Sequence, residues 1–124
     1  MSQLLAVMLG GCIGAACRYG VSLGAAHLWG SRFPWGTLVV NWSGCLLIGL
    51  AFGWAERAAW FTPGMRLFFI TGFLGSLTTF SSFAVETVNT ATTGPGHIAA
   101  LNVLIHNAGG LMLVAVGLWC ARVL

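Results

Sequence analysis

Long apolar stretches alternate along the chain with short segments that carry glycine and proline. No charged side chain occurs in residues 1–17, 33–55, 67–85 or 87–121. The three prolines, Pro34, Pro63 and Pro95, each lie in one of the segments that separate successive apolar stretches, and each is near a glycine. An apolar helix needs about 20 residues to cross a hydrocarbon layer of about 30 Å. The pattern therefore predicts one all-α domain, 1–124, with four transmembrane helices at about 3–28, 36–58, 64–91 and 97–122.

Composition excludes a soluble protein. Charged residues make up 6% and hydrophobic residues 58% of the chain, whereas an ordinary soluble domain has about 25% charged residues. The charged side chains are Arg18, Arg32, Glu56, Arg57, Arg66, Glu86 and Arg122. Seven charged side chains are too few to cover a water-facing surface. Most of the chain must therefore face the lipid bilayer or its own helices. The net charge of +3 does not indicate a nucleic-acid partner, because the arginines are scattered and form no basic patch.

The arginines give a weak orientation signal. Four spans place both termini on one side of the membrane together with Arg57, Arg66 and Arg122, while the opposite side has only Arg32 in its loops. The positive-inside rule slightly favours termini in the cytoplasm. A bias this small is also compatible with insertion in both orientations, which would allow an antiparallel homodimer.

The 18 glycines predict close helix packing, since small residues let helix backbones approach one another in lipid. Several recur four residues apart, including Gly10 with Gly14, Gly20 with Gly24, and Gly49 with Gly53. Four short helices leave no room for an aqueous pore within one subunit. Any pathway is therefore expected at a subunit interface.

Polar residues within the spans are the candidates for function, because each is costly in hydrocarbon unless it is satisfied. Arg18 lies far along the first helix, where it either snorkels to the membrane surface or supplies the positive field of a vestibule that attracts anions. Asn41 lies well inside the second span. It either joins two helices by hydrogen bonds or donates to a passing anion.

The third span contains an unusual segment, residues 71–83, in which glycines are followed by several hydroxyl side chains. Glycine in a helix interior costs roughly 1 kcal/mol relative to alanine, and serine and threonine compete for backbone hydrogen bonds. We therefore predict a helix break near Gly75–Thr79. A break at this depth is tolerated only where it is buried in protein or lines a cavity. Its free carbonyls would suit a small cation, and its free N–H groups an anion.

Phe80 and Phe83 follow this segment, three residues apart and on one helix face. Their spacing alone favours phenylalanines that face the lipid or pack in the core of the helix bundle. The surrounding hydroxyls favour another role, because the positive edges of two aromatic rings can coordinate an anion without a full charge that would trap it.

The chain resembles the CrcB/Fluc fluoride channels in three blocks, taken in order over its whole length: Gly10-Gly11 to Arg18-Tyr19, Gly36 to Asn41, and Gly72-Phe73-Leu74-Gly75 to Thr78-Thr79-Phe80-Ser81-Ser82-Phe83. The resemblance implies an antiparallel, dual-topology homodimer with two fluoride pores at its interface. Such a protein exports cytoplasmic fluoride passively across the inner membrane and so lowers fluoride toxicity.

The resemblance also implies roles for individual residues. Phe80, Phe83 and Asn41 match pore residues, and Thr79 and Ser82 match pore-lining hydroxyl positions. Arg18 matches a first-helix arginine. Gly75 and Thr78 match positions whose backbone carbonyls, from both subunits, hold a structural Na⁺ at the dimer centre.

Two departures from the family pattern are visible. Ser76 stands where many relatives have a second glycine. Gly110 and Val114 lack the hydroxyls that form a polar track along the fourth helix of relatives, which leaves Asn102, His106 and Asn107 as its polar residues.

Two other classes of membrane protein fit this pattern less well. A four-helix proton-coupled drug exporter depends, by family resemblance, on a glutamate within its first helix, and no acid occurs there. A non-transporting scaffold would explain the glycines but not the segment at 71–83. An enzyme is not expected, because no nucleophile–base or metal-ligand spacing is found.

Overall fold

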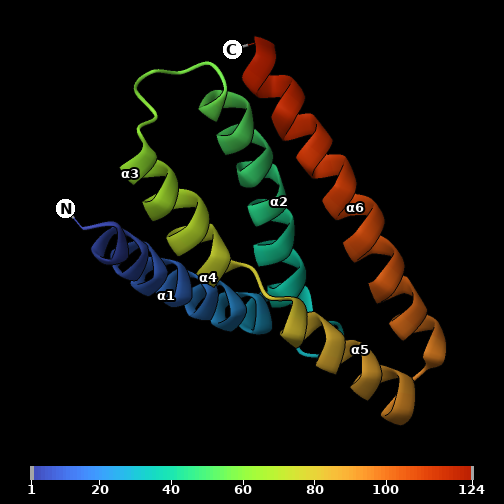
Figure 1. The fold of residues 1–124 in the computed structure, drawn as a ribbon. Coiled ribbons are helices and arrows are strands. Elements are labelled where there is room, and N and C mark those ends of the chain that lie inside the picture. Colours follow the sequence, from blue (N-terminus) through green and yellow to red (C-terminus); the bar gives the residue numbers. More distant parts are fainter. Residues whose placement is uncertain (1, 124) are drawn as a thin grey trace.

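The computed structural model describes residues 2–123 and is helical throughout its regular parts (Figure 1). Its elements are α1 (Gln3–Trp29), α2 (Trp35–Ala55), α3 (Pro63–Arg66), η1 (Leu67–Leu74), α4 (Gly75–Leu77), α5 (Phe80–Thr93) and α6 (Gly96–Val123). Four stretches are long and apolar enough to cross a membrane: Gln3–Trp29, Trp35–Ala55, Pro63–Thr93 and Gly96–Val123. The prediction of four membrane-spanning helices is confirmed.

Local capping chemistry explains where the helices begin and end. The Ser2 hydroxyl accepts a hydrogen bond from the Leu5 amide (3.2 Å) at the start of α1. Gly30 ends that helix with a φ of 74°, a backbone conformation that side chains disfavour. The second span ends at Ala55, three residues earlier than expected, because the amides of Arg57 and Ala58 both donate to the Trp54 carbonyl in a tight turn.

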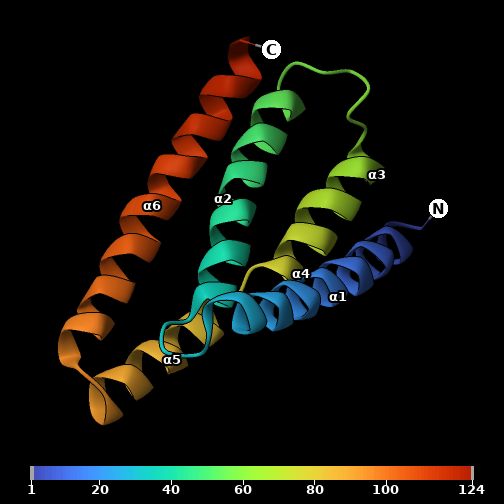
Figure 2. The same cartoon turned by 180° about the vertical axis from the view of Figure 1, so that it is seen from behind.

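The helices form two pairs, joined through the third span. Helix α2 packs most extensively against α6, and α1 packs against η1 and α4. After the break, α5 leaves α1 and packs against α6 instead, as the view from behind makes plain (Figure 2). The third span therefore belongs to one pair in its first half and to the other in its second half.

Glycine permits the close approach between α1 and η1. A Cβ atom added at Gly72 would lie 2.6 Å from the carbonyl oxygen of Val7, which leaves no space for a side chain. The predicted packing role therefore holds at this contact. Gly20 and Gly24 differ, because a Cβ at either position would meet no atom of the described chain within 4 Å.

Aromatic pairs mark the two ends of α2. Trp29 and Trp35 have ring centroids 6.0 Å apart at its start, and Trp54 and Trp60 are 5.9 Å apart at its end. The helix between Trp35 and Trp54 spans about 28 Å at 1.5 Å per residue, close to the thickness of a hydrocarbon layer. Tryptophan at both ends of a span is typical of residues that anchor a helix at the membrane interfaces.

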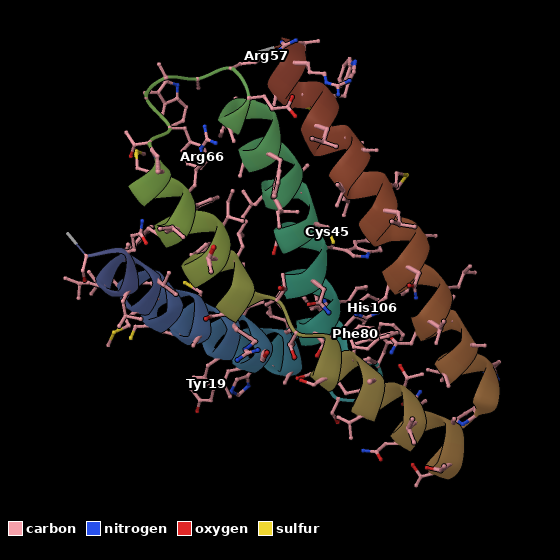
Figure 3. The ribbon with its side chains drawn as sticks, viewed as in Figure 1. Tyr19, Cys45, Arg57, Arg66, Phe80 and His106 are labelled. Atoms are coloured by element: carbon pink, nitrogen blue, oxygen red, sulfur yellow. The ribbon has the colours of Figure 1, made fainter. Side chains whose placement is uncertain are left out.

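Basic residues gather at one end of the molecule. Arg57 donates to the Arg122 carbonyl (2.8 Å), and Arg66 donates to the carbonyl of Phe61 (3.1 Å). Figure 3 places Arg57 and Arg66 at the end of the bundle where α2 finishes. This is the side on which the sequence places three of the arginines.

Candidate ion pathway at the break in the third span

The third span is interrupted at Thr78 and Thr79, whose backbones are extended with ψ angles of 154° and 109°. Before the break, η1 has the wider turns of a π-helix, and the short α4 ends at Leu77. Wide turns of this kind occur frequently at functional sites. The predicted break is confirmed, at the C-terminal end of the range expected for it.

Asn41 of α2 binds the break with both ends of its side-chain amide. Its Nδ2 donates to the Thr79 carbonyl (3.1 Å), and its Oδ1 accepts from the Thr79 amide (2.7 Å). Asn41 therefore does join two helices, one of the two roles considered for it. Since the amide group carries two hydrogens, one remains beyond the bond to Thr79. Donation of that hydrogen to an anion stays a prediction.

This arrangement releases the two carbonyls expected to hold Na⁺. In a continuous helix the Thr79 amide would bond to the Gly75 carbonyl, and the Ser82 amide to the Thr78 carbonyl. Here the Thr79 amide donates to Asn41, and the Ser82 amide donates to the Thr79 hydroxyl (3.2 Å). Oxygen atoms of unwound backbone suit a small hard cation such as Na⁺. The residues present therefore fit the predicted ion, whose binding stays a prediction.

A group of hydroxyls begins the second half of the span. The Thr79 hydroxyl caps α5, donates to the Ser82 hydroxyl (3.0 Å) and lies 3.2 Å from that of Ser81. Side chains of this kind rotate their hydrogens to suit a neighbour. They can therefore act as donors to an anion at the start of α5.

The two phenylalanines after the break lie in different surroundings. Their ring centroids are 5.4 Å apart with a 51° angle between the planes. Phe83 is 8% exposed and its ring lies 4.6 Å from the imidazole of His106, whereas Phe80 is 77% exposed. The rings are adjacent, as their spacing predicted, but only Phe83 is enclosed by its own chain.

An open cavity of about 350 Å³ brings most of the predicted site together. Of the pore and Na⁺-site residues predicted from the sequence, those that line it are Asn41, Gly75, Thr78, Thr79, Phe80 and Phe83. Cys45 also lines it, as do His106 and Asn107, two of the three polar residues noted on the fourth helix. Figure 3 shows His106 and Phe80 close together beside the break. Two predicted residues are not part of the lining. Ser82 is half-buried behind Thr79, and Arg18 is half-buried on α1.

A polar cluster that the sequence analysis did not identify lies between α2, α5 and α6. The Thr37 hydroxyl donates to Oε1 of Glu86 (2.7 Å), and Nδ2 of Asn102 donates to the Thr87 hydroxyl (2.8 Å). Within residues 2–123, three buried side-chain atoms have no hydrogen-bond partner: Glu86 Oε2, Asn102 Oδ1 and His106 Nε2. Buried polar atoms without partners are uncommon and point to water or a ligand.

Residues of this polar cluster line two different cavities. Phe83 and His106 line the first cavity, while Thr37 and Glu86 line a second of about 320 Å³ that reaches Arg32 in the α1–α2 connection. Helical spacing could have revealed these polar residues. Thr37 precedes Asn41 by four residues, Glu86 follows Phe83 by three, and His106 follows Asn102 by four, so each pair shares a helix face.

The fold and the site define a multi-span membrane protein with a broken helix beside a cavity that contains polar side chains, an arrangement typical of proteins that conduct or transport ions. Residues 5–118 match the family described as "CrcB-like protein, Camphor Resistance (CrcB)". The chain belongs to this family, as its residue blocks predicted.

Similar proteins carry the name "Fluoride-specific ion channel FluC". The one from Salinibacter ruber is 44% identical over 123 residues, which cover 98% of this chain and 90% of the relative. The one from Clostridium perfringens (strain 13 / Type A) is 40% identical over 120 residues, covering 97% and 94%. The one from Citrifermentans bemidjiense is 40% identical over 124 residues and covers both chains completely.

Proposed function

We propose that this protein is a fluoride-selective channel that lets fluoride leave the cytoplasm passively. The observation that carries the proposal is the pair of phenylalanines beside the helix break, in a cavity that holds hydrogen-bond donors. Relatives that match nearly the whole length of this chain are named as fluoride-specific ion channels.

The chemistry of the cavity suits a small, strongly hydrated anion. The amide of Asn41, the hydroxyl of Thr79 and the ring edges of Phe80 and Phe83 replace water by several weak contacts. Weak, multiple sites let an ion leave as readily as it entered, which conduction requires. Among residues 2–123, no arginine lines this cavity, so no permanent positive charge there would hold the anion tightly.

We further propose that the working unit is an antiparallel homodimer with a pore on each side of its interface. The cavity is open on one side, and Phe80 is 77% exposed beside it. A second copy would enclose both. The Gly75 and Thr78 carbonyls of the two subunits would then hold a central Na⁺, whose positive charge stabilises the interface between the pores. We place the protein in the inner (plasma) membrane, with Arg18 supplying positive charge to a vestibule.

A fluoride-electrode efflux assay tests the function directly. Purified protein in liposomes loaded with fluoride should release it on addition of a potassium ionophore, while chloride-loaded liposomes should retain their anion. The variant Asn41→Asp places a negative charge in the path and should abolish efflux. Failure of the wild-type protein to release fluoride would refute the proposal.

A further inference from the structure

A third cavity, of about 360 Å³, lies between the end of α2 and the start of the third span. Five of its eight lining residues are aromatic: Trp54, Trp60, Phe61, Phe68 and Phe69. The other three are alanine, glycine and methionine, so no charged side chain lines the cavity. It shares no lining residue with the cavity beside the break. A ligand that fills it must therefore be apolar where it meets this wall.

The cavity lies at the depth where the hydrocarbon of the bilayer meets its polar surface. Trp54 and Trp60 line it, and these two residues form the aromatic pair at the end of α2. Tryptophan pairs of this kind mark the membrane interface. Trp60 is 57% exposed and Met65, which also lines the cavity, is 43% exposed. The apolar wall is therefore open to its surroundings, which at this depth of a membrane are phospholipids.

Arg66 is fixed at the edge of this cavity by its contacts with Phe61. Its Nε donates to the Phe61 carbonyl (3.1 Å), and its Cζ lies 6.0 Å from the centroid of the Phe61 ring. A second N–H group of Arg66 donates to the Ala55 carbonyl. A guanidinium group has five N–H donors, so three remain. The side chain of Arg66 is exposed, and these donors are therefore available to a group outside the chain.

The charge at this end of the molecule favours an anionic group. Arg57 and Arg122 lie there with Arg66, whereas Glu56 is the acidic residue of the α2–α3 connection (Figure 3). The bonds of Arg57 and Arg66 go to carbonyl oxygens, which do not neutralise a positive charge. A phosphate group accepts parallel hydrogen bonds from a guanidinium, and basic pockets between membrane-spanning helices bind anionic lipid headgroups.

We propose that this cavity binds a phospholipid of net negative charge, one in each subunit. An acyl chain packs against the aromatic wall, and the phosphate accepts hydrogen bonds from Arg66. The bound lipid connects the end of α2 to the start of the third span, because residues of both line the cavity. The site is separate from the proposed ion pathway and does not depend on the channel function.

A second copy of the chain suits this cavity less well than a lipid. In an antiparallel dimer, the end of the partner at this level would be the one whose loops carry only Arg32 as a charged residue. Its positive charge would repel Arg66. A parallel partner would bring the same three arginines to this level. An anionic phospholipid supplies the opposite charge in both arrangements.

Native mass spectrometry of the full-length protein, released from detergent micelles, tests the preference for a negative headgroup. Delipidated protein is titrated with phosphatidylglycerol or with phosphatidylcholine of identical acyl chains. The wild-type protein should bind phosphatidylglycerol at least about fivefold more tightly, since one arginine near an anionic membrane surface contributes about 1 kcal/mol. Arg66→Gln should reduce this preference about fivefold. The matched control Arg32→Gln removes an exposed arginine at the other end of the molecule and should keep the preference.

A second measurement locates the acyl chain and needs no change at Arg66. Bromine atoms on an acyl chain quench tryptophan fluorescence by contact. The protein is reconstituted in phosphatidylcholine with a small fraction of brominated phosphatidylglycerol or of brominated phosphatidylcholine, and the anionic lipid should quench more. Replacement of Trp54 and Trp60 by phenylalanine should abolish this difference. Replacement of Trp29 and Trp35, the pair at the other end of α2, should leave it intact. These variants decide the outcome even if Arg66→Gln does not fold.

Several results would overturn the proposal. Equal affinity of the wild-type protein for the two lipids, or equal quenching by the two brominated lipids, excludes a site for an anionic phospholipid. An equal loss of preference in Arg66→Gln and Arg32→Gln assigns the effect to net charge and not to this cavity. Failure of both brominated lipids to quench Trp54 and Trp60 indicates that a second copy covers the wall. Fluoride efflux is measured separately, so none of these results bears on the channel function.

Discussion

The two hydrogen bonds between the Asn41 side chain and the Thr79 backbone allow a quantitative prediction for Asn41→Ala. The substitution removes the bonds to the Thr79 carbonyl (3.1 Å) and from the Thr79 amide (2.7 Å). Thr79 is 8% exposed, so neither backbone group regains a water molecule easily. One hydrogen bond contributes about 0.5–1.5 kcal/mol in proteins and about 0.6 kcal/mol on average in a membrane protein. The free energy of unfolding should therefore fall by about 1–3 kcal/mol.

Equilibrium unfolding in detergent micelles, followed by tryptophan fluorescence, measures this loss. Ser43→Ala is the matched control, because Ser43 lies on the same helix and its hydroxyl donates only to the Val40 carbonyl one turn earlier (3.1 Å). That change removes one bond within a single helix, where serine competes with the helical backbone, so it should cost no more than about 0.5 kcal/mol, the low end of the range. Equal stability of the Asn41→Ala and Ser43→Ala proteins would show that the side chain of Asn41 does not hold the break.

The remaining predictions concern flux and orientation. Phe80→Ile and Phe83→Ile should each cut fluoride efflux from liposomes sharply, because aliphatic side chains lack a positive ring edge; unchanged efflux would remove that residue from the pore. Gly44→Ala should destabilise the fold by about 1 kcal/mol, because its new methyl group meets Thr78, whose rotamer is held by a bond to a backbone carbonyl (2.9 Å). Gly64→Ala, which meets no atom within 4 Å, is the control, and equal melting temperatures would contradict the argument. Accessibility labelling of a terminal tag in whole cells should find both membrane orientations; a single orientation would exclude the antiparallel dimer.

The number and extent of the spans could be predicted from the sequence because bilayer thickness sets the length of an apolar helix. Pro63 and the Gly94-Pro95-Gly96 turn then mark where helices begin and end. The break was also predictable, since the glycine and hydroxyl content of residues 71–83 makes a continuous helix unfavourable whatever surrounds it.

The tertiary structure decided which polar groups meet. Thr37 and Glu86 are 49 positions apart in the chain, and Phe83 meets His106 across two helices. Such contacts depend on the rotation and vertical offset of each helix, and close glycine contacts such as that of Gly72 set these quantities. Composition and spacing place a residue on a helix face. Only packing determines which face of a neighbouring helix lies opposite, because in lipid no hydrophobic force distinguishes one apolar face from another.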